Sequence, residues 1–465
     1  MGNNIHSSHE PPSGGGVALA AQQLHWRDCP AAQQPAWPDR ACLEAEVGKV
    51  ARLPALVFAG ETRSLRRKLA LAEEGKAFIL QAGDCAETFA MCHGPRIHQL
   101  LKVILQMSAI LSYGGDREVI RIGRIAGQYA KPRSSDTEAV QGITLPSYRG
   151  DMVNGLEPTI TSRTPDPRRI VEGYFRAAAT LNLIRAFTMG GYAAWEFAQN
   201  WHDGLRFEPA IEHKFQRVIE GIRQSFGFMH SLGVDMQDAI FTQAPLFTSH
   251  EALLLEYEDA LTRVDTTTGM LYNAGAHMVW LGNRTRQLEG AHVAYASTIQ
   301  NPVGIKIGSG TSPTEVLRLL ERINPANERG KVVLITRMGA ALVSEFLPQL
   351  LRAVQRAGQH VAWSCDPMHG NTYINARGIK TRDFAKVHAE LLGFFAIHAA
   401  EGTVPAGVHL EITGEDVTEC VGGTIGVQHE TLNSNYQSSC DPRLNASQAL
   451  EIAFELSQML KNTLH

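Results

Sequence analysis

The stretch "AFILQAGDC", residues 77–85, is an almost continuous apolar run that ends at Gly83, with an acid and a thiol directly after it. A run of this kind is typical of a strand that is buried on both faces, as in a parallel sheet. Seven later runs share this character, and helical periodicity separates most of them. They are REVIRIG (117–123), AIFTQA (239–244), HMVWLG (277–282), GIKIG (304–308), VVLITR (332–337), HVAWSC (360–365) and VHLEIT (408–413).

Eight buried strands that alternate with helices predict a (β/α)8 barrel, the TIM barrel of the α/β class. A doubly wound open sheet is the structural alternative, because it is built from the same strands and helices. The chain has 465 residues, which is enough for one elaborated barrel or for two domains.

Several segments go beyond a plain barrel. Residues 1–20 are polar and lack the apolar core of a signal peptide, so we expect a disordered N-terminal tail. Residues 21–465 are expected to form a single barrel domain, with N-terminal helices over about 40–76. Periodicity predicts further helices over about 165–232, inserted between the second and third strands. Oligomer contacts, regulatory pockets and a purely structural role all remain open for these helices.

The composition is typical of a soluble globular protein, with 44% hydrophobic and 19% charged residues and a formal charge of −4. This charge argues against a nucleic-acid partner, and no apolar stretch is long enough for a membrane span. The seven cysteines form no C-x-x-C pair, which indicates a reducing compartment. We therefore expect a cytoplasmic protein.

The residues just past the predicted strands are chemically distinctive, because reactive groups of such barrels project from the carboxyl ends of the strands. A thiol, an imidazole and two carboxylates stand there: Cys85, His369, Glu411 and Asp441. Together they suit a divalent transition metal. Taken singly, each has a structural explanation, since a free cysteine is often simply buried and a histidine can shape a turn.

Four cations occupy other strand ends: Arg124, Arg284, Lys306 and Arg337. Like charges gathered in one mouth indicate a polyanionic ligand with phosphate or carboxylate groups. A second basic group, Lys131-Pro132-Arg133-Ser134, could cradle another phosphate, with Lys380 and Arg382 approaching from the opposite side. The structural alternatives are a salt bridge for any one cation and a solvated basic turn for the second group.

A dozen motifs, in order from about residue 25 to the C-terminus, resemble those of the type II 3-deoxy-D-arabino-heptulosonate 7-phosphate (DAHP) synthases. They include LQAGDCAETF (80–89), GRIAGQYAKPRS (123–134), GNRTRQLEGAH (282–292), CDPMHGNT (365–372) and CDPRLN (440–445). The resemblance implies a TIM-barrel enzyme that condenses phosphoenolpyruvate with erythrose 4-phosphate, the first step of the shikimate pathway. Both substrates are anions, in agreement with the cations at the strand ends.

The resemblance also implies roles for individual residues. One divalent metal ion per subunit, commonly Mn²⁺ or Co²⁺ and otherwise Zn²⁺, Fe²⁺ or Cd²⁺, is expected on Cys85, His369, Glu411 and Asp441. Phosphoenolpyruvate is expected to contact Arg124, Arg284, Lys306, Arg337 and the backbone at Asn283. Erythrose 4-phosphate is expected to contact Lys131, Pro132, Arg133, Ser134 and Lys380. Glu251 is expected to orient the attacking water, and Lys131 to meet or protonate the aldehyde oxygen. Asp84 and Glu87 are expected to shape a loop.

One position departs from the family pattern, because Asn283 stands where Glu or Asp is expected. A backbone contact tolerates Asn, whereas a side-chain contact implies an altered substrate or metal preference. The alternatives within the family are secondary-metabolism enzymes, such as amino-DAHP synthases or copies for phenazine or ansamycin precursors. A catalytically silent regulatory paralogue and a metal-dependent aldolase are alternatives from other classes.

The inserted helices match in length those of the long family members, in which they build interfaces and aromatic amino-acid pockets. We therefore expect a homo-oligomer, a dimer or tetramer, with feedback by Trp, Phe or Tyr and with chorismate mutase as a partner. Cys440 directly precedes Asp441. If Cys85 and Asp441 hold one ion, oxidation of the metal-free protein is expected to link Cys85 to Cys440.

Overall fold

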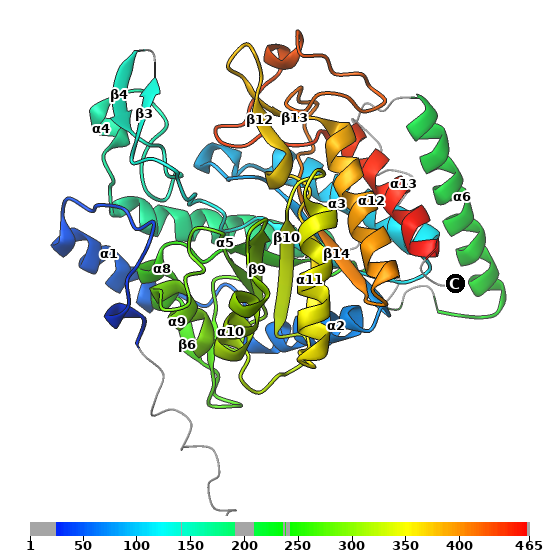
Figure 1. Ribbon diagram of the computed structural model, residues 1–465, viewed down its shortest axis with the longest axis horizontal. Helices are drawn as coiled ribbons and strands as arrows, with labels where there is room; N and C mark the ends of the chain where they lie inside the picture. The colour runs from blue at the N-terminus through cyan, green and yellow to red at the C-terminus, as the bar shows by residue number, and fades with distance from the viewer. Residues whose placement is uncertain (1–24, 141, 191–208, 236–237, 239–241, 463–465) are drawn as a thin grey trace, which may run out of the picture.

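A closed barrel of eight parallel strands forms the centre of the computed structural model (Figure 1). The structure describes residues 25–140, 142–190, 209–235, 238 and 242–462. Around the barrel the strands follow the order β1-β14-β11-β10-β9-β8-β5-β2, and every neighbouring pair is parallel. Closure confirms the predicted TIM barrel and rules out the open sheet. The strands are β1 (Ala77–Gly83), β2 (Glu118–Arg124), β5 (Phe247–Glu251), β8 (Met278–Leu281), β9 (Val303–Gly308), β10 (Val332–Arg337), β11 (Ala362–Cys365) and β14 (Pro405–Glu411).

The prediction for the third strand is wrong. It named 239–244, of which 239–241 lie outside the described residues, whereas the barrel strand is β5, Phe247–Glu251. This strand reads FTSHE and is fully buried although most of it is polar. Its polar groups have partners inside the protein: Ser249 Oγ accepts from Gln81 Nε2 at 3.0 Å, and His250 Nε2 lies 2.9 Å from Glu258 Oε1. An apolar pattern cannot reveal a strand whose burial depends on such distant partners.

Helices cover the outside of the barrel, each with an apolar face turned inward. In α10, for example, Val316, Leu319, Leu320 and Ile323 are buried at helical spacing, and Ser312 caps the first turn by accepting from Glu315 N at 3.2 Å. The covering helices are α3 (Gly94–Gly115), α8 (Leu255–Ala260), α9 (Ala291–Thr298), α10 (Pro313–Ile323), α11 (Val343–Arg356), α12 (Phe384–Ala400) and α13 (Ala446–Asn462).

The amino-terminal end of the barrel is closed by an apolar plug. Helix α2 (Ala59–Glu73) packs Leu65, Leu69 and Ala72 beneath the barrel, against the interior side chains of the strands. These interior side chains include Ile79, Ile120, Met278, Trp280, Val333 and Ile335. In the part of the chain that the structure describes, the barrel interior is therefore a packed core, and its carboxyl-terminal end is the end available for a site.

Additional helices precede the barrel and are inserted between two of its strands. Helix α1 (Arg40–Arg52) precedes α2, and α4 (Ile160–Arg163), α5 (Arg168–Met189) and α6 (Pro209–Ser231) lie between β2 and β5. Figure 1 shows α6 on the flank of the molecule, beside α13. Among the described residues, no helix is both long enough and apolar enough to cross a bilayer.

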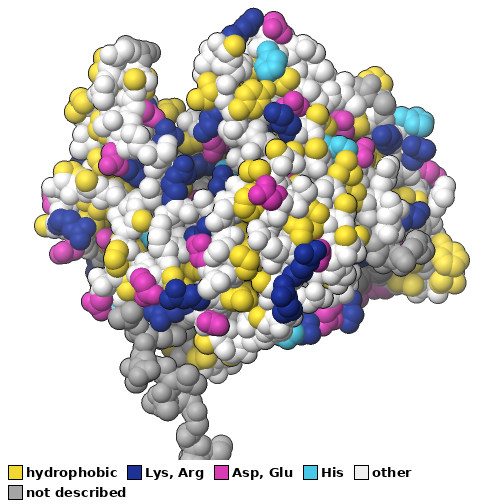
Figure 2. Space-filling view, in the orientation of Figure 1, with side chains coloured by type: hydrophobic (Ala, Val, Ile, Leu, Met, Phe, Trp, Pro, Cys, Tyr) yellow, Lys and Arg dark blue, Asp and Glu magenta, His cyan; other side chains and the backbone are white. Residues whose placement is uncertain are grey.

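Two hairpins rise beyond the carboxyl ends of the strands (Figure 1). One is formed by β3 (Thr137–Val140) and β4 (Ile143–Pro146), and the other by β12 (Thr372–Ile374) and β13 (Lys380–Arg382). A third hairpin, β6 (Thr262–Val264) with β7 (Leu271–Asn273), follows β5. Lys and Arg side chains gather in the hollow between the first two hairpins (Figure 2).

Candidate active site

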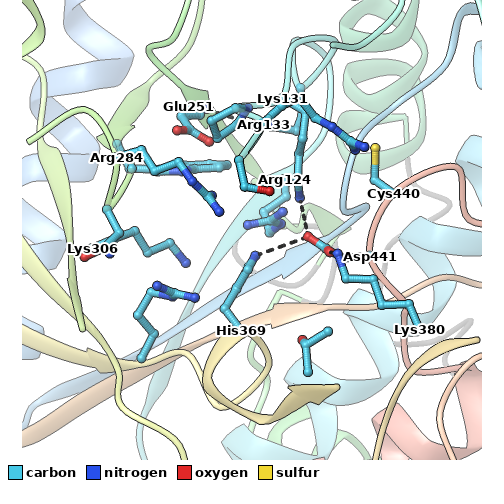
Figure 3. A pocket seen from close by; sticks show the side chains of 18 residues that line it. Arg124, Lys131, Arg133, Glu251, Arg284, Lys306, His369, Lys380, Cys440 and Asp441 are labelled. Carbon is cyan, nitrogen blue, oxygen red and sulfur yellow. Dashed lines mark hydrogen bonds and ion pairs between the residues drawn. The ribbon is translucent and has the colours of Figure 1, made fainter. Parts of the chain in front are cut away.

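A cavity of about 330 Å³ opens at the mouth of the barrel. Most of the predicted site residues line it, and Figure 3 shows them facing one another across the cavity. The lining comprises Arg124, Gln128, Lys131, Pro132, Arg133, Ser134, Glu251, Trp280, Gly282, Asn283, Arg284, Lys306, Arg337, His369, Thr372, Lys380, Cys440 and Asp441. Cys85 and Glu411 are fully buried directly behind it.

The four predicted metal ligands come together on one side of this cavity. One ligand atom from each of Cys85, Glu411 and Asp441 lies within 4.8 Å of the other two. His369 Nε2 lies beside two of these three residues, 3.2 Å from Glu411 Oε1 and 3.8 Å from Asp441 Oδ2. A thiol, an imidazole and two carboxylates at this spacing form a mixed S/N/O donor set, which suits a divalent transition metal.

Strand register explains why these residues meet. Gly83 at the end of β1 pairs with Arg124 of β2 on one side and with Glu411 of β14 on the other. Cys85 therefore stands just above the level of Glu411. Asp441 reaches the same point because its backbone N–H donates to Cys85 Sγ at 3.2 Å.

The protonation of the donor set follows from burial and from nearby cations. Burial raises the pKa of the Cys85 thiol well above its usual value. Burial also opposes ionisation of Glu411, but His369, Lys131 and Arg382 outweigh it and hold the pKa of this carboxyl well below its usual range. The carboxylates are thus ready to bind a cation, whereas the thiol loses its proton only when a strong positive charge arrives.

Two lysines already reach the donor set (Figure 3). Lys131 Nζ lies 2.8 Å from Cys85 Sγ and 2.9 Å from Asp441 Oδ2, and Lys380 Nζ donates to Asp441 Oδ1. Arg382, the other cation considered beside Lys380, does not face the cavity. It is fully buried and donates to Glu411 Oε2 at 2.7 Å, so it supports a carboxylate instead of approaching a phosphate.

The first basic group spreads around the other side of the cavity. Arg124 is 2% exposed, donates to Glu411 Oε1 at 2.9 Å and lies 4.9 Å from the centre of the Trp280 ring. Arg284 and Arg337 reach the cavity from the ends of β8 and β10. The Asn283 side chain accepts from Arg286 Nε at 3.2 Å. This contact engages the Asn283 side-chain oxygen, and residue 283 is part of the cavity lining.

Asp366 was not singled out from the sequence, although it organises one side of the site. Oδ2 of this fully buried carboxylate accepts from Lys306 Nζ and lies 2.7 Å from His369 Nδ1, and its Oδ1 accepts the backbone N–H groups of Met368 at 3.0 Å and His369 at 3.2 Å. Burial lowers the pKa of Lys306 to about 8, and Asp366 opposes that shift. The spacing in "DPMH", with Asp three residues before His, was the available signal, because metal-binding histidines usually have a carboxylate partner.

Glu251, at the end of β5, is a buried residue of the cavity lining. Its Oε1 is a buried atom without a hydrogen-bond partner among the described residues, and its backbone N–H donates to Gln128 Oε1 at 2.8 Å. Burial raises the pKa of this carboxyl, although Lys131 and Lys306 oppose the shift. A buried acceptor without a partner is expected to bind water or a ligand group.

The two acids flanking Cys85 shape loops, as predicted. Glu87 accepts three consecutive backbone N–H groups, from Ala126 at 3.0 Å, Gly127 at 2.9 Å and Gln128 at 2.8 Å. It thereby holds the loop between Arg124 and Lys131, in which Ala126 has a φ of 63°. Burial raises the pKa of Glu87 to about 7 against these three donors.

Asp84 fixes the loop that carries Cys440 and Asp441. Both of its oxygens lie 3.1 Å from Arg443 Nη1, and Arg443 Nη2 donates to Glu419 Oε1 at 2.7 Å. Sequence reasoning missed Arg443 and Glu419, since neither follows a strand. Cys440 also touches Cys85, and this contact lowers the pKa of the Cys440 thiol to about 7.

Comparison with known proteins identifies the family of this chain. Residues 21–457 match the model of the Class-II DAHP synthetase family. A protein of Streptomyces coelicolor named phospho-2-dehydro-3-deoxyheptonate aldolase is 48% identical over 94% of this chain and 97% of its own length. Proteins of the same name from Neurospora crassa (45% identical, covering 92% of both chains) and Mycolicibacterium smegmatis (AroG, 44% identical, covering 93% of both) are similarly close. The chain therefore belongs to the Class-II DAHP synthetase family.

Proposed function

We propose that this cavity performs the reaction for which its relatives are named. Phosphoenolpyruvate, D-erythrose 4-phosphate and water give 3-deoxy-D-arabino-heptulosonate 7-phosphate and inorganic phosphate. This is the first step of the shikimate pathway, which leads to chorismate and the aromatic amino acids. The observation that carries the proposal is the arrangement of two groups of cations around one S/N/O donor set in a single cavity.

The donor set of Cys85, His369, Glu411 and Asp441 fits a divalent ion such as Mn²⁺ or Co²⁺. When bound there, the ion acts as a Lewis acid on the aldehyde oxygen of erythrose 4-phosphate. The second contact of His369, through Nδ1 to Asp366, fixes the ring so that Nε2 faces the other ligands.

The cations divide between the two substrates. Arg124, Arg284, Lys306, Arg337 and the backbone N–H of Asn283 are assigned to the phosphate and carboxylate of phosphoenolpyruvate. Lys131, Pro132, Arg133, Ser134 and Lys380 are assigned to erythrose 4-phosphate, because all five line the cavity and both lysines reach Asp441. Holding both anions in place contributes on the order of 7–11 kcal/mol to lowering the barrier.

Two side chains have roles in the chemistry itself. Lys131 is within hydrogen-bond distance of Cys85 and Asp441 and can donate a proton to the oxygen formed from the aldehyde. Glu251 offers a buried oxygen that has no hydrogen-bond partner in the described part of the chain, and it can orient the water that adds to C2 of phosphoenolpyruvate. Phosphate then leaves with cleavage of the C–O bond.

Phosphate release tests the proposal. Purified protein is mixed with phosphoenolpyruvate and erythrose 4-phosphate, with Mn²⁺ or with a chelator, and phosphate and the seven-carbon product are measured. We expect metal-dependent formation of both in equal amounts. A seven-carbon product without phosphate would indicate an aldolase, no product would indicate a silent paralogue, and a preference for an amino analogue of erythrose 4-phosphate would indicate a secondary pathway.

We further propose a cytoplasmic homo-oligomer, a dimer or tetramer, with feedback by an aromatic amino acid and with chorismate mutase as a partner. Exposed apolar side chains on the inserted helices support the oligomer, among them Phe175 (54% exposed) on α5 and Phe228 (64% exposed) on α6. Size-exclusion chromatography with light scattering tests the oligomer, and a monomer at micromolar concentration would contradict it. Peptide mapping after oxidation of chelated protein tests the proposed Cys85–Cys440 disulfide.

A further inference from the structure

A buried glutamate outside the cavity ties together two loops of the site. Glu390 belongs to α12 and is fully buried on the outer side of the barrel. Its Oε1 accepts the backbone N–H groups of Met338 and Gly339, both at 2.9 Å. Its Oε2 accepts from Asn371 Nδ2 at 2.7 Å. One carboxylate therefore serves two loops, the one after β10 and the one after β11.

These two loops carry residues of the proposed machinery. Met338 directly follows Arg337, which is assigned to phosphoenolpyruvate, and Asn371 ends the short 3-10 helix η5 (His369–Asn371), which begins with a metal ligand. Asn371 strengthens the link, because its Oδ1 accepts from Ala340 N at 3.0 Å. Glu390 and Asn371 thus connect both loops through three backbone N–H groups.

The backbones of the two loops also touch directly. A Cβ atom on Gly370 would lie 2.3 Å from Gly339 N, and a Cβ atom on Gly339 would lie 2.8 Å from Gly370 O. Gly339 in addition has a φ of +88°, which disfavours any other residue. The two loops are therefore packed so closely that a shift of one displaces the other.

We propose that Glu390 is a positioning residue that couples Arg337 to His369, so that the anion clamp and the metal ligand keep one fixed spacing. The identity of the two ligands rests on the proposed function. The coupling itself rests on the hydrogen bonds and the glycine contact. Glu390 does not line the cavity, so any effect of its replacement reaches substrate and metal through the two loops.

The test uses Glu390→Gln in the full-length protein. The amide keeps the volume of the side chain, and its single oxygen can still accept from Met338 and Gly339. Its NH2 group then faces the Asn371 amide nitrogen, donor against donor. We expect the KM for phosphoenolpyruvate to rise about tenfold and the dissociation constant for Mn²⁺, measured by chelator competition, to rise about tenfold. We expect kcat to change less than KM.

Hydrogen exchange gives a readout that needs no activity. Peptides covering 338–340 and 369–372 are expected to exchange faster in Glu390→Gln than in the wild type. Should this variant not fold, Asn371→Ala cuts the same link from the other side and is expected to raise the Mn²⁺ dissociation constant and the exchange at 338–340.

The matched control is Glu73→Gln. Glu73 is the last residue of α2 and contacts the chain at the amino-terminal end of β10, whereas Glu390 contacts the loop at its carboxyl-terminal end. The Glu73 side chain is 4% exposed, and it accepts the backbone N–H of Gly330 at 2.6 Å, just before β10. This variant is expected to leave the KM, the Mn²⁺ affinity and the exchange of both loop peptides within twofold of the wild type.

The outcomes separate this inference from the proposed function. The coupling would be overturned if the wild type is active but Glu390→Gln changes the hydrogen exchange of neither loop peptide, or of only one. An equal effect of Glu73→Gln would do the same. A wild type that releases no phosphate, combined with faster exchange of both loops and weaker Mn²⁺ binding in Glu390→Gln, would leave the coupling in place and refute the proposed function.

Discussion

Between pH 5 and pH 8, Glu87 is expected to lower the free energy of unfolding of the wild type by about 2.5 kcal/mol, and replacing Glu87 with glutamine is expected to abolish this decrease. The Glu87 carboxyl is buried and has its pKa raised to about 7 from an ordinary value of 4.5. Over that window the folded protein retains a proton that the unfolded chain releases. The contribution of Glu87 to stability is therefore greatest below pH 4.5, falls as the pH rises through 7, and is lost by about pH 8.

The magnitude follows from linkage. Each pKa unit corresponds to about 1.36 kcal/mol, so the full shift is worth about 3.4 kcal/mol, of which about 2.5 kcal/mol is lost between pH 5 and pH 8. Glutamine does not titrate, so the variant lacks this loss. It has instead a constant penalty, because one of the three backbone N–H donors loses its acceptor.

The assay is equilibrium unfolding in urea at pH 5, 6, 7 and 8, with wild type and variant side by side. Other titrating groups, such as Glu390, cancel in the difference between the two proteins. Glu321→Gln, on the exposed face of α10, is the control and is expected to give a difference that does not vary with pH. A wild-type-minus-Glu87→Gln difference that changes by less than about 0.5 kcal/mol, or that grows with pH, would refute the assignment of the shift to burial of this carboxyl.

Further outcomes are expected at the site. Cys85→Ser should weaken Mn²⁺ binding at least tenfold in a chelator competition while leaving the fold intact by circular dichroism, and unchanged affinity would make Cys85 a structural residue. Glu251→Gln should lower kcat by about a hundredfold with the KM of both substrates within about threefold, and a change confined to KM would rule out a role in the chemical step. Gly370→Ala, whose new methyl group would press on Gly339, should lower the free energy of unfolding by about 1–3 kcal/mol, and wild-type stability would mean that the loops can separate.

The barrel could be predicted because seven of its strands are nearly continuous apolar runs, and their observed bounds lie within three residues of the predicted ones. The eighth, β5, could not be found in this way. Its Thr248, Ser249 and His250 are buried through polar partners on other strands and helices, and such pairing depends on the finished fold. The run upstream at 239–244 was the better match to the apolar pattern.

The candidate site shows the same division. Residues that end a strand, such as Arg124 and Glu411, could be identified because all parallel strands of a barrel end at one mouth. The residues that hold these strand-end side chains in place could not be identified from the sequence. Arg443 meets Asp84 across 359 positions of sequence, and Glu390 reaches the β10 loop from a helix that no strand-end rule considers.

The apolar plug beneath the cavity has a consequence for the passage of molecules through the site. Because α2 fills the opposite end of the barrel, the described residues leave one route into the cavity, over the rim between the two hairpins. Under the proposed function, two substrates arrive by this route, and a sugar phosphate and a free phosphate depart by it. The departing phosphate must pass the same cations that attract the next phosphoenolpyruvate. Under the proposed function, inorganic phosphate therefore competes with phosphoenolpyruvate for these cations.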